Sequence, residues 1–238
     1  MAVEELEIQL TSGTLTKKMR MDLAKNPNTS MYALTILSKD EDESVRHNIA
    51  MNPNAPTYVL AELSEDNRKY IRRSVAKNPH TSTEVLRKLS EDENWYIRNK
   101  VASNLNTSTN VLAMLSIDKD WRVRNRVAKN PSTPTEVLTI LSKDKKWDVR
   151  YSVASNTNTP IYILTKLSED ENWDVRRGIA DNSNTPIKVL AELSEDESWD
   201  VRNGTAKSPY TPKNILSKLS KDEDWRVRHS AANNLEGK

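Results

Sequence analysis

A block of 26 residues repeats along this chain without an insertion or a deletion. Most blocks begin with asparagine, often followed by proline, and the register holds to Asn234. A fixed period of about 20 to 50 residues indicates a stack of one supersecondary unit, in which each unit contacts only its neighbours. We therefore expect one continuous array rather than separate globular domains. The blocks begin at Asn26, Asn52, Asn78, Asn104, Asn130, Asn156, Asn182 and Ser208.

The composition fits such an array and excludes several classes of function. Hydrophobic residues make up 36% of the chain and Phe is absent, which a solenoid tolerates because its core is a thin seam between layers. The formal net charge of +2 favours neither nucleic acid nor a membrane surface. The absence of Cys excludes disulfides and thiolate chemistry. With neither a leader sequence nor an apolar span in view, we expect a cytoplasmic protein.

Residues 130–155 show how one block predicts two helices. Thr133 is the expected N-cap of the first helix, and Glu136 three residues later completes a capping box. Leu138 and Leu141 then fall on one face, as in an amphipathic helix. This first helix is predicted to span about ten residues.

The second helix of the same block is predicted to be shorter. Asp144 is its expected N-cap, and Trp147, Val149 and Val153 supply its buried side. The asparagine of the next block, here Asn156, is expected to end it in the left-handed conformation. Neither helix would be stable alone in water, so stacking on neighbouring blocks has to stabilise both.

The block pattern also predicts how the chain is divided. Residues 26–234 hold eight full blocks, which form the expected all-α solenoid. Residues 1–25 match only the second helix of a block, at Met19-Arg20 and Leu23-Ala24, and are interpreted as a degenerate N-terminal capping unit. Residues 235–238 remain as a tail.

The pattern Val-Arg-x-x-Val-Ala-x-Asn-Pro-x-Thr-Pro-x-x-Val-Leu-x-x-Leu-x-x-Asp resembles the variant leucine-rich repeat family over residues 19–234. This resemblance implies a right-handed solenoid that pairs an α-helix with a shorter helix, often of the 3-10 type. The period is longer than the family's, and the chain lacks the cysteines that hold an iron–sulfur cluster in one member, so no cofactor is expected. The two-helix block also resembles HEAT-like repeats, which are longer. The family has no common enzymatic activity.

One aspartate and one arginine recur in every block. Eight copies in one register favour a structural ladder, in which the aspartate caps the second helix and pairs with an arginine of the same or the next block. A catalytic or metal-binding row is the weaker interpretation, because an enzyme needs one site. The residues are Asp40, Asp66, Asp92, Asp118, Asp144, Asp170, Asp196 and Asp222, and Arg46, Arg72, Arg98, Arg124, Arg150, Arg176, Arg202 and Arg228.

A tryptophan recurs in the last six blocks, whereas the first two have Glu43 and Lys69 at this position. We interpret the row as a hydrophobic lid in which each ring packs on its neighbour. The alternative is a platform on which bases or carbohydrates stack. The tryptophans are Trp95, Trp121, Trp147, Trp173, Trp199 and Trp225.

Positions that vary between blocks are the candidates for specificity. In blocks two to four, cationic residues share one face of the second helices, tyrosines lie among them, and no acidic residue occupies the same positions. The same positions become neutral or acidic further along, for example at Asp148 and Asp174. The alternative is an ordinary solvated face with uneven charge. The predicted binding patch consists of Arg73, Lys77, Lys100, Arg122, Arg126, Lys129, Tyr70 and Tyr96.

These observations predict a non-catalytic binding or scaffold module that uses the second-helix face to recognise a protein or peptide. The alternative partner is nucleic acid, held through its phosphates by the cationic patch. His47, His80 and His229 lie far apart in the array, so no metal site is predicted. With only four Gly, a phosphate-cradling loop is not expected either. We therefore predict no catalytic residue, no cofactor and no membrane partner.

Overall fold

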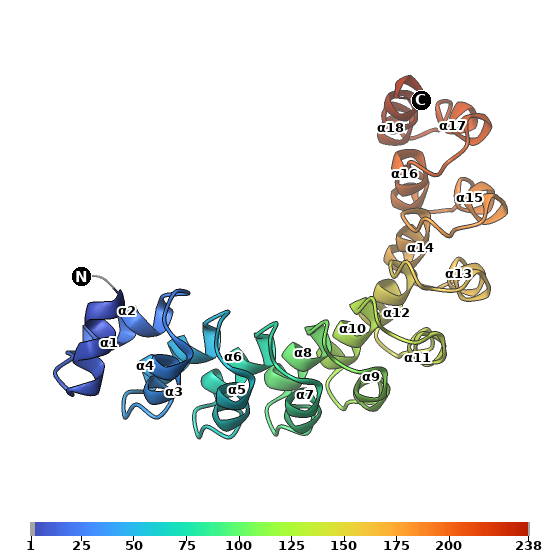
Figure 1. The fold of residues 1–238 in the computed structure, drawn as a ribbon. Helices are drawn as coiled ribbons and strands as arrows, with labels where there is room; N and C mark the ends of the chain where they lie inside the picture. The colour runs from blue at the N-terminus through green and yellow to red at the C-terminus, as the bar shows by residue number, and fades with distance from the viewer. Residues whose placement is uncertain (1–2, 238) are drawn as a thin grey trace. The chain divides into compact units, whose positions relative to one another are not determined.

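The computed structural model describes residues 3–237, and within them the chain forms eighteen helices and no strand. The helices belong to two compact units, the first of which ends at Leu115 while the second starts at Ser116. Each repeat contributes a first helix, with an odd number in Figure 1, and a second helix, with an even number. This architecture confirms the predicted all-α solenoid of two-helix repeats.

In unit 1 the second helices pack directly on one another in order, and each first helix packs on a neighbouring second helix. Figure 1 shows the two rows. The helices of this unit are α1 (Val3–Thr11), α2 (Lys17–Lys25), α3 (Met31–Leu37), α4 (Glu43–Met51), α5 (Thr57–Leu63), α6 (Lys69–Lys77), α7 (Thr83–Leu89), α8 (Trp95–Ser103) and α9 (Thr109–Leu115).

Unit 2 repeats the same arrangement, with its second helices in mutual contact. No helix within residues 3–237 combines the length and the apolar character needed to cross a membrane. The helices of unit 2 are α10 (Trp121–Lys129), α11 (Thr135–Leu141), α12 (Trp147–Ala154), α13 (Ile161–Leu167), α14 (Trp173–Ala180), α15 (Ile187–Leu193), α16 (Trp199–Lys207), α17 (Lys213–Leu219) and α18 (Trp225–Glu236).

The predicted lengths of the two helices are wrong. First helices such as α11 have 7 residues rather than about ten, whereas α12 and the other second helices have 8 or more and are α-helical throughout. The expected capping box is absent, because the Thr133 hydroxyl donates to the carbonyl of Val127 at 2.6 Å instead of capping the first helix. Pro134 takes the N-cap position, so the helix starts later than predicted.

A repeating asparagine links each repeat to the one before it. Asn52 is 2% exposed, and its Nδ2 donates to the carbonyls of Ala24 at 2.9 Å and Asn26 at 3.0 Å. Its Oδ1 accepts the N–H of Asn54 at 2.8 Å. One side chain thus satisfies the Ala24 carbonyl that the end of α2 leaves free, and it adds a second donor to the Asn26 carbonyl, which also accepts the N–H of Thr29. Asn78, Asn104, Asn156, Asn182 and Asn234 make the same two bonds to the preceding repeat.

The predicted left-handed ending of the second helix is wrong. No residue other than glycine has a positive φ within residues 3–237, and Asn52 is extended, with φ −66° and ψ 127°. The following Pro53 disfavours the helical region for Asn52. The extended backbone in turn allows the side chain to reach the previous repeat.

The arginine and aspartate rows form a ladder between successive repeats, as predicted, but each aspartate pairs with the arginine of the preceding repeat rather than with one of its own or the next repeat. Arg46 Nε donates to Asp66 Oδ2 of the next repeat at 2.7 Å, and Arg46 Nη1 donates to the carbonyl of Asp40 in its own repeat at 2.7 Å. The ion pairs are Arg20–Asp40, Arg46–Asp66 and Arg72–Asp92 in unit 1, and Arg124–Asp144, Arg150–Asp170, Arg176–Asp196 and Arg202–Asp222 in unit 2.

The ladder aspartate, however, does not cap the second helix. Asp144 accepts the N–H of Lys146 at 2.9 Å, and Lys146 itself occupies the N-cap of α12. The carboxylate closes a turn that precedes the helix, and from this position it also meets Arg124 of the repeat before.

The predicted division of the chain into a cap, eight repeats and a tail stays a prediction.

We predict that Asn156→Ala lowers the free energy of unfolding by about 2 kcal/mol, because it leaves the buried carbonyl of Ala128 without a donor and removes one of the two donors of the Asn130 carbonyl. Asn158→Ala is the matched control, since this exposed asparagine makes a single bond to the carbonyl of Pro131 at 2.6 Å. Urea unfolding followed by circular dichroism measures both. An equal loss in the two variants would contradict the role given to the buried asparagines.

A second prediction concerns acid. The ion pair with Arg226 and the N–H of the same residue lower the pKa of Asp224 to about 2, despite some opposing desolvation. A carboxylate whose folded pKa lies below its unfolded value stabilises the fold above about pH 4, and this contribution disappears as the pH falls towards 2. Asp224→Asn keeps the cap, as Asn172 does at the same repeat position. The variant should therefore lose less stability between pH 4 and pH 2 in urea unfolding, and an unchanged pH dependence would contradict the prediction.

Candidate functional site

A pocket of about 350 Å³ lies between the second helices α4, α6 and α8 of unit 1. Its lining combines cationic, aromatic and apolar side chains, and none of its residues is acidic. We call it the Tyr96 pocket. Its lining residues are His47, Met51, Arg73, Ser74, Lys77, Asn78, Pro79, Tyr96 and Lys100.

The ring of Tyr96 carries two of the cations. The guanidinium carbon of Arg73 lies 5.5 Å from the ring centroid, and Nζ of Lys100 lies 4.8 Å from it. The neighbouring Trp95 ring contacts Tyr96 with 5.3 Å between centroids. A cation over an aromatic face gains about 0.5–1 kcal/mol at an exposed site, which is enough to hold the two cations in place without neutralising them.

The positive charge of the Tyr96 pocket is not compensated within the described residues. No ion pair is formed there by Arg73, Lys77 or Lys100, in contrast to Arg72 beside them, which pairs with Asp92 at 2.7 Å. Like charges placed together destabilise the folded chain unless an anion joins them. This excess of three positive charges is the feature that marks the pocket as a candidate site.

Equivalent positions in other repeats show that this clustering is unusual. A side chain on one second helix lies over the residue 27 positions later, and that residue is complementary in size or polarity. His47 and Ser74 are hydrogen-bonded at 3.2 Å, as are Asn125 and Ser152 at 2.7 Å. Arg73 and Lys100 are the corresponding pair in the Tyr96 pocket, and both are cations.

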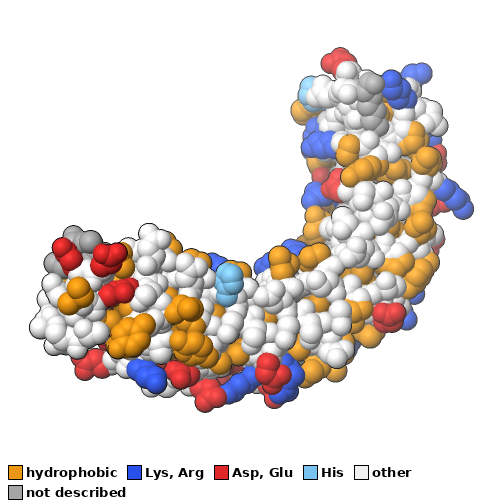
Figure 2. Space-filling view, viewed as in Figure 1, with side chains coloured by type: hydrophobic (Ala, Val, Ile, Leu, Met, Phe, Trp, Pro, Cys, Tyr) orange, Lys and Arg blue, Asp and Glu red, His pale blue; other side chains and the backbone are white. Residues whose placement is uncertain are grey.

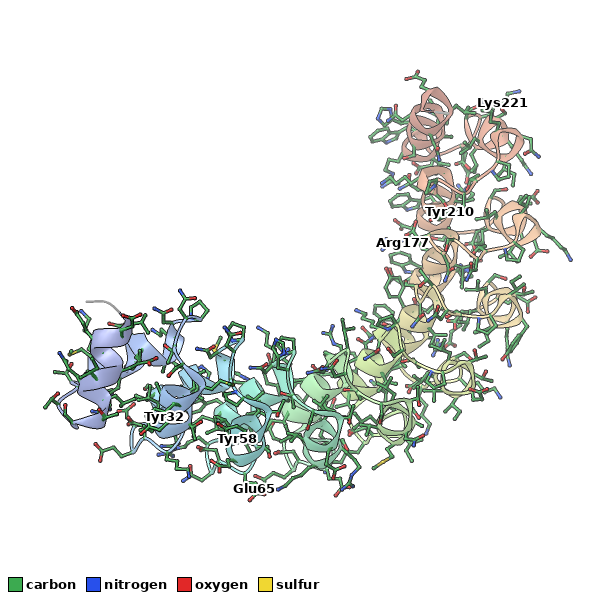
Figure 3. All side chains as sticks on the ribbon, viewed as in Figure 1. Tyr32, Tyr58, Glu65, Arg177, Tyr210 and Lys221 are labelled. Atoms are coloured by element: carbon green, nitrogen blue, oxygen red, sulfur yellow. The ribbon has the colours of Figure 1, made fainter. Side chains whose placement is uncertain are left out.

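Two glycines show the same complementarity between residues 27 positions apart, because each leaves room for a large side chain on the preceding second helix. A Cβ on Gly204 would lie 2.6 Å from Cγ of Arg177, which is labelled on α14 in Figure 3. A Cβ on Gly178 would lie 2.9 Å from the Tyr151 ring. Where a side chain on one second helix is large, the residue 27 positions later is thus a glycine, which leaves space for it. The Arg73–Lys100 pair departs from this adjustment, which supports a role other than packing.

His47 contributes polarity to the pocket rather than charge. Burial lowers the pKa of His47, and the nearby positive charge of Arg73 lowers it further, so the ring is neutral at pH 7. Its Nδ1 shares a hydrogen bond with Ser74, and its ring meets Tyr70 edge-on at 5.3 Å. Tyr70 does not line the pocket, and burial together with a hydrogen bond to Glu43 raises its pKa.

The structure therefore brings together four of the eight predicted patch residues: Arg73, Lys77, Lys100 and Tyr96. The sequence analysis missed Met51, His47, Ser74 and Pro79. The 26-residue register contained the signal for two of them, because Met51 holds the position of Lys77 one repeat earlier and His47 that of Arg73.

The three remaining cations of the predicted patch lie on α10 in unit 2. Arg122 pairs with Asp120 at 3.2 Å and lies 5.7 Å from the Trp121 ring centroid, so its charge is partly compensated. Arg126 has a buried Nε without a hydrogen-bond partner, and Lys129 is exposed at the end of the helix. These three cations form their own group and line none of the pockets described in unit 2.

The tryptophan row is only partly covered. Trp147 is 39% exposed, so its predicted place on the buried side of α12 is wrong; as the first helical residue it lies at the open turn. Trp121, Trp173 and Trp199 stack against arginines, with the Arg226 guanidinium carbon 3.3 Å from the Trp199 centroid.

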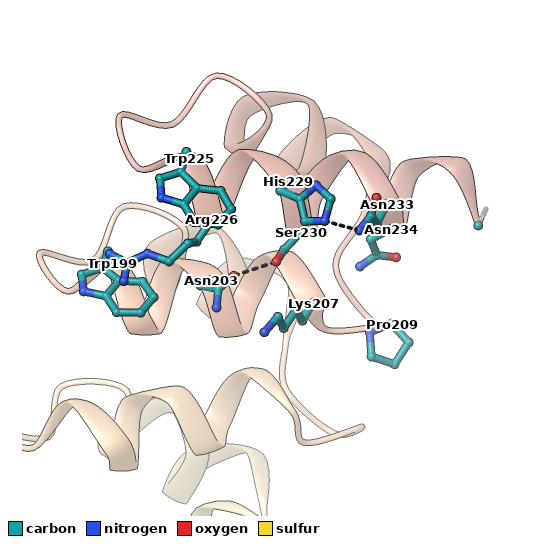
Figure 4. A pocket seen from close by; sticks show the side chains of 11 residues that line it. Trp199, Asn203, Lys207, Pro209, Trp225, Arg226, His229, Ser230, Asn233 and Asn234 are labelled. Carbon is teal, nitrogen blue, oxygen red and sulfur yellow. Dashed lines mark hydrogen bonds between the residues drawn. The ribbon is translucent and has the colours of Figure 1, made fainter.

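A second pocket, of about 980 Å³, lies against α16 and α18 in unit 2 (Figure 4). Arg226 lies along Trp199 there, Ser230 donates to Asn203 at 2.7 Å, and Asn233 meets His229 at 3.1 Å. Its polar groups are thus largely paired with one another. Within residues 3–237 no group of three His, Cys, Asp or Glu side chains is placed to hold a metal ion.

The first-helix side of unit 1 has a different character. Met31 and Tyr32 of α3 are each 66% exposed and Tyr58 of α5 is 53% exposed, and orange side chains gather in this region in Figure 2. Tyr32 and Tyr58 are labelled in Figure 3, and the Tyr58 hydroxyl is hydrogen-bonded to Thr35 at 2.6 Å. The two sides of unit 1 therefore offer an apolar and a cationic surface.

Comparison with solved structures agrees with the fold class. The chain is similar to a leucine-rich repeat variant with a novel repetitive structural motif, with a TM-score of 0.66 and 24% identity over 90% of this chain and 85% of that one. Weaker likenesses are to YibA of Escherichia coli (TM-score 0.47, 20% identity, 84% of this chain and 98% of that one) and to importin beta (TM-score 0.41, 13% identity, 98% of this chain and 37% of that one). Comparisons with protein-family models and with curated proteins give no match. The predicted resemblance to the variant leucine-rich repeat is thus confirmed for the fold.

The charge environments of two lysines predict opposite effects of one substitution. Lys100→Glu places a carboxylate beside Arg73 and Lys77 and should stabilise the fold by up to about 1 kcal/mol at low ionic strength. Lys207 lies near Asp181, whose pKa is raised by burial while Arg177 and Lys207 offset part of that rise. Lys207→Glu should therefore destabilise the fold or leave it unchanged. Urea midpoints in 10 mM and 500 mM salt test the contrast, and equal shifts in both variants would contradict it.

Proposed function

We propose that this chain is a non-catalytic recognition module whose second-helix face in unit 1 binds a negatively charged segment of a protein or peptide. The observation that carries the proposal is the Tyr96 pocket, where Arg73 and Lys100 lie over an aromatic ring, Lys77 lines the same pocket and no acidic residue does. An acidic segment would remove the repulsion among these cations and gain charge-assisted hydrogen bonds.

The rest of the fold supports recognition rather than catalysis. The recurring asparagine, arginine and aspartate side chains are used for stacking, as Asn78 and the Arg72–Asp92 pair illustrate beside the pocket. Such groups hold the helices at fixed spacing and leave the variable positions available to a partner. A preformed surface lowers the ordering cost of binding.

A protein segment fits the pocket better than a nucleic-acid backbone. The cations that line the Tyr96 pocket come only from α6 and α8, whereas α4 contributes His47 and Met51 to its lining. Binding along a duplex depends on many phosphate contacts, about 6–10 in well-studied cases. Three cations beside the apolar side chains of Met51 and Pro79 suit a protein segment, in which one charged side chain has apolar neighbours, better than a nucleic-acid backbone.

Site-directed photocrosslinking in an extract of the source cells tests the proposal. Benzoylphenylalanine is placed at Met51, which lines the pocket and is 56% exposed, or at Met114 on the first helix α9, which is 49% exposed. We expect defined protein adducts from position 51 and none of these adducts from position 114. Combining the probe at 51 with Lys100→Glu should reduce the adducts about tenfold.

Two outcomes would contradict the proposal. Adducts that are the same at both positions, or unaffected by Lys100→Glu, would show that the pocket does not select the partner. Adducts from position 51 that contain nucleic acid and disappear on nuclease treatment would support the alternative partner instead.

A further inference from the structure

We infer that the Tyr96 pocket is a receptor for a phosphorylated side chain within the partner segment. This inference rests on the proposed function and adds the chemistry of the bound group. It predicts that phosphorylation of the partner switches binding on, because the pocket supplies more positive charge than one carboxylate can compensate.

The count of donors and charges favours phosphate over carboxylate. Arg73, Lys77 and Lys100 bring three positive charges to the pocket, and His47 adds none at pH 7 because burial and Arg73 lower its pKa. A phosphorylated side chain carries about −1.5 to −2 charges at pH 7 and three acceptor oxygens. A carboxylate carries one charge, which would leave two cations unpaired in the same small volume.

The cations also have suitable positions and chemistry. The Arg73 guanidinium is a planar fork that matches two phosphate oxygens, while the lysine ammonium groups act as point charges. Arg73 and Lys100 lie 5.5 Å and 4.8 Å from the centroid of one ring, so α6 and α8 each bring a cation to the Tyr96 side chain within the same pocket. Unlike the ladder arginines, none of the three is committed to an aspartate within the described residues.

The remaining lining explains why the phosphate would be carried by a side chain. Met51 of α4 and Pro79 after α6 place apolar surface beside the cations, and Met51 is 56% exposed. The volume of about 350 Å³ falls within the range of about 300–1,000 Å³ for pockets that enclose small organic groups. Phosphate alone would leave this apolar part of the pocket unused.

Fluorescence anisotropy with labelled degenerate peptides tests the inference on the full chain. The pools are nine residues long, with phosphotyrosine, phosphoserine, unmodified tyrosine, unmodified serine or glutamate fixed at the centre of random flanks. Inorganic phosphate serves as competitor, and a random 20-base-pair duplex serves as the nucleic-acid probe. At least one phosphorylated pool should bind about tenfold more tightly than its unmodified counterpart and than the glutamate pool.

Variants locate the binding. Lys77→Glu and Lys100→Glu should each remove most of the preference for phosphate, and inorganic phosphate should compete in the unaltered protein. Lys25→Glu is the matched control, because Lys25 on α2 holds the repeat position of Lys77 but lies outside the pocket. It makes the same change in net charge and should keep the preference. Circular dichroism confirms that each variant is folded.

The outcomes separate this inference from the proposed function. Equal binding of phosphorylated, unmodified and glutamate pools overturns the phosphate inference while leaving peptide recognition standing. If no peptide pool binds but protein adducts still form at Met51, the phosphate inference is likewise overturned while the proposed function stands. Duplex binding that exceeds that of every pool overturns the inference in favour of nucleic acid. Loss of the preference in Lys25→Glu as well would show that net charge, rather than the pocket, attracts the peptide.

Discussion

The structure depends on one hydrogen-bonded contact, which a buried asparagine makes with the end of the preceding repeat. Asn52, Asn78 and their equivalents each donate to two backbone carbonyls at the end of the previous second helix, one in its last turn and one at its C-cap, and so hold the next repeat against that end. Buried carbonyls without a donor are costly, so the contact specifies a single register between repeats. The Arg–Asp pairs reinforce that register from the other end of the second helix, at Arg46–Asp66 for example. The fold is therefore set by a few positions that recur every 26 residues.

The separation between recurring residues that stack the repeats and variable residues on the second-helix face explains how a repetitive chain can carry a local site. Because stacking is supplied by the recurring residues, the other residues on the second-helix face are free to differ between repeats. At most of these positions neighbouring residues are mutually adjusted, as Arg177 is to Gly204. Arg73 and Lys100 are not adjusted in this way, and two like charges over the ring of Tyr96 reduce stability unless an anion binds. Residues that lower stability without a packing benefit are expected at functional sites.

The sequence predicted the architecture well because its period is a direct record of the contacts between repeats. A ladder of Arg–Asp pairs also followed from the register, as did the side-by-side placement of Arg73, Lys77 and Lys100. The partner did not, because each aspartate pairs with the arginine of the preceding repeat and not with one of its own or the next repeat. The helix ends were predicted poorly. Thr133, Asp144 and Asn156 each looked like a local cap. In the structure Thr133 donates to the carbonyl of Val127, and Asp144 accepts from Arg124. Asn156 donates to the carbonyls of Ala128 and Asn130. Local propensity rules describe single helices, and they fail where a polar side chain is used by another element. The pocket was missed in part because Met51 and His47 are uncharged and stand out only when neighbouring repeats are superposed.

The central claim is that buried asparagine side chains hold the repeats in register and thereby place the Tyr96 pocket. Hydrogen exchange of side-chain amides, followed by NMR, tests it directly. The account predicts that the Nδ2 protons of Asn52 and Asn78 exchange about a hundredfold more slowly than those of the exposed Asn110, since opening them requires neighbouring repeats to separate. Exchange at the same rate in all three side chains would mean that these amides are not held between repeats, and would contradict the account.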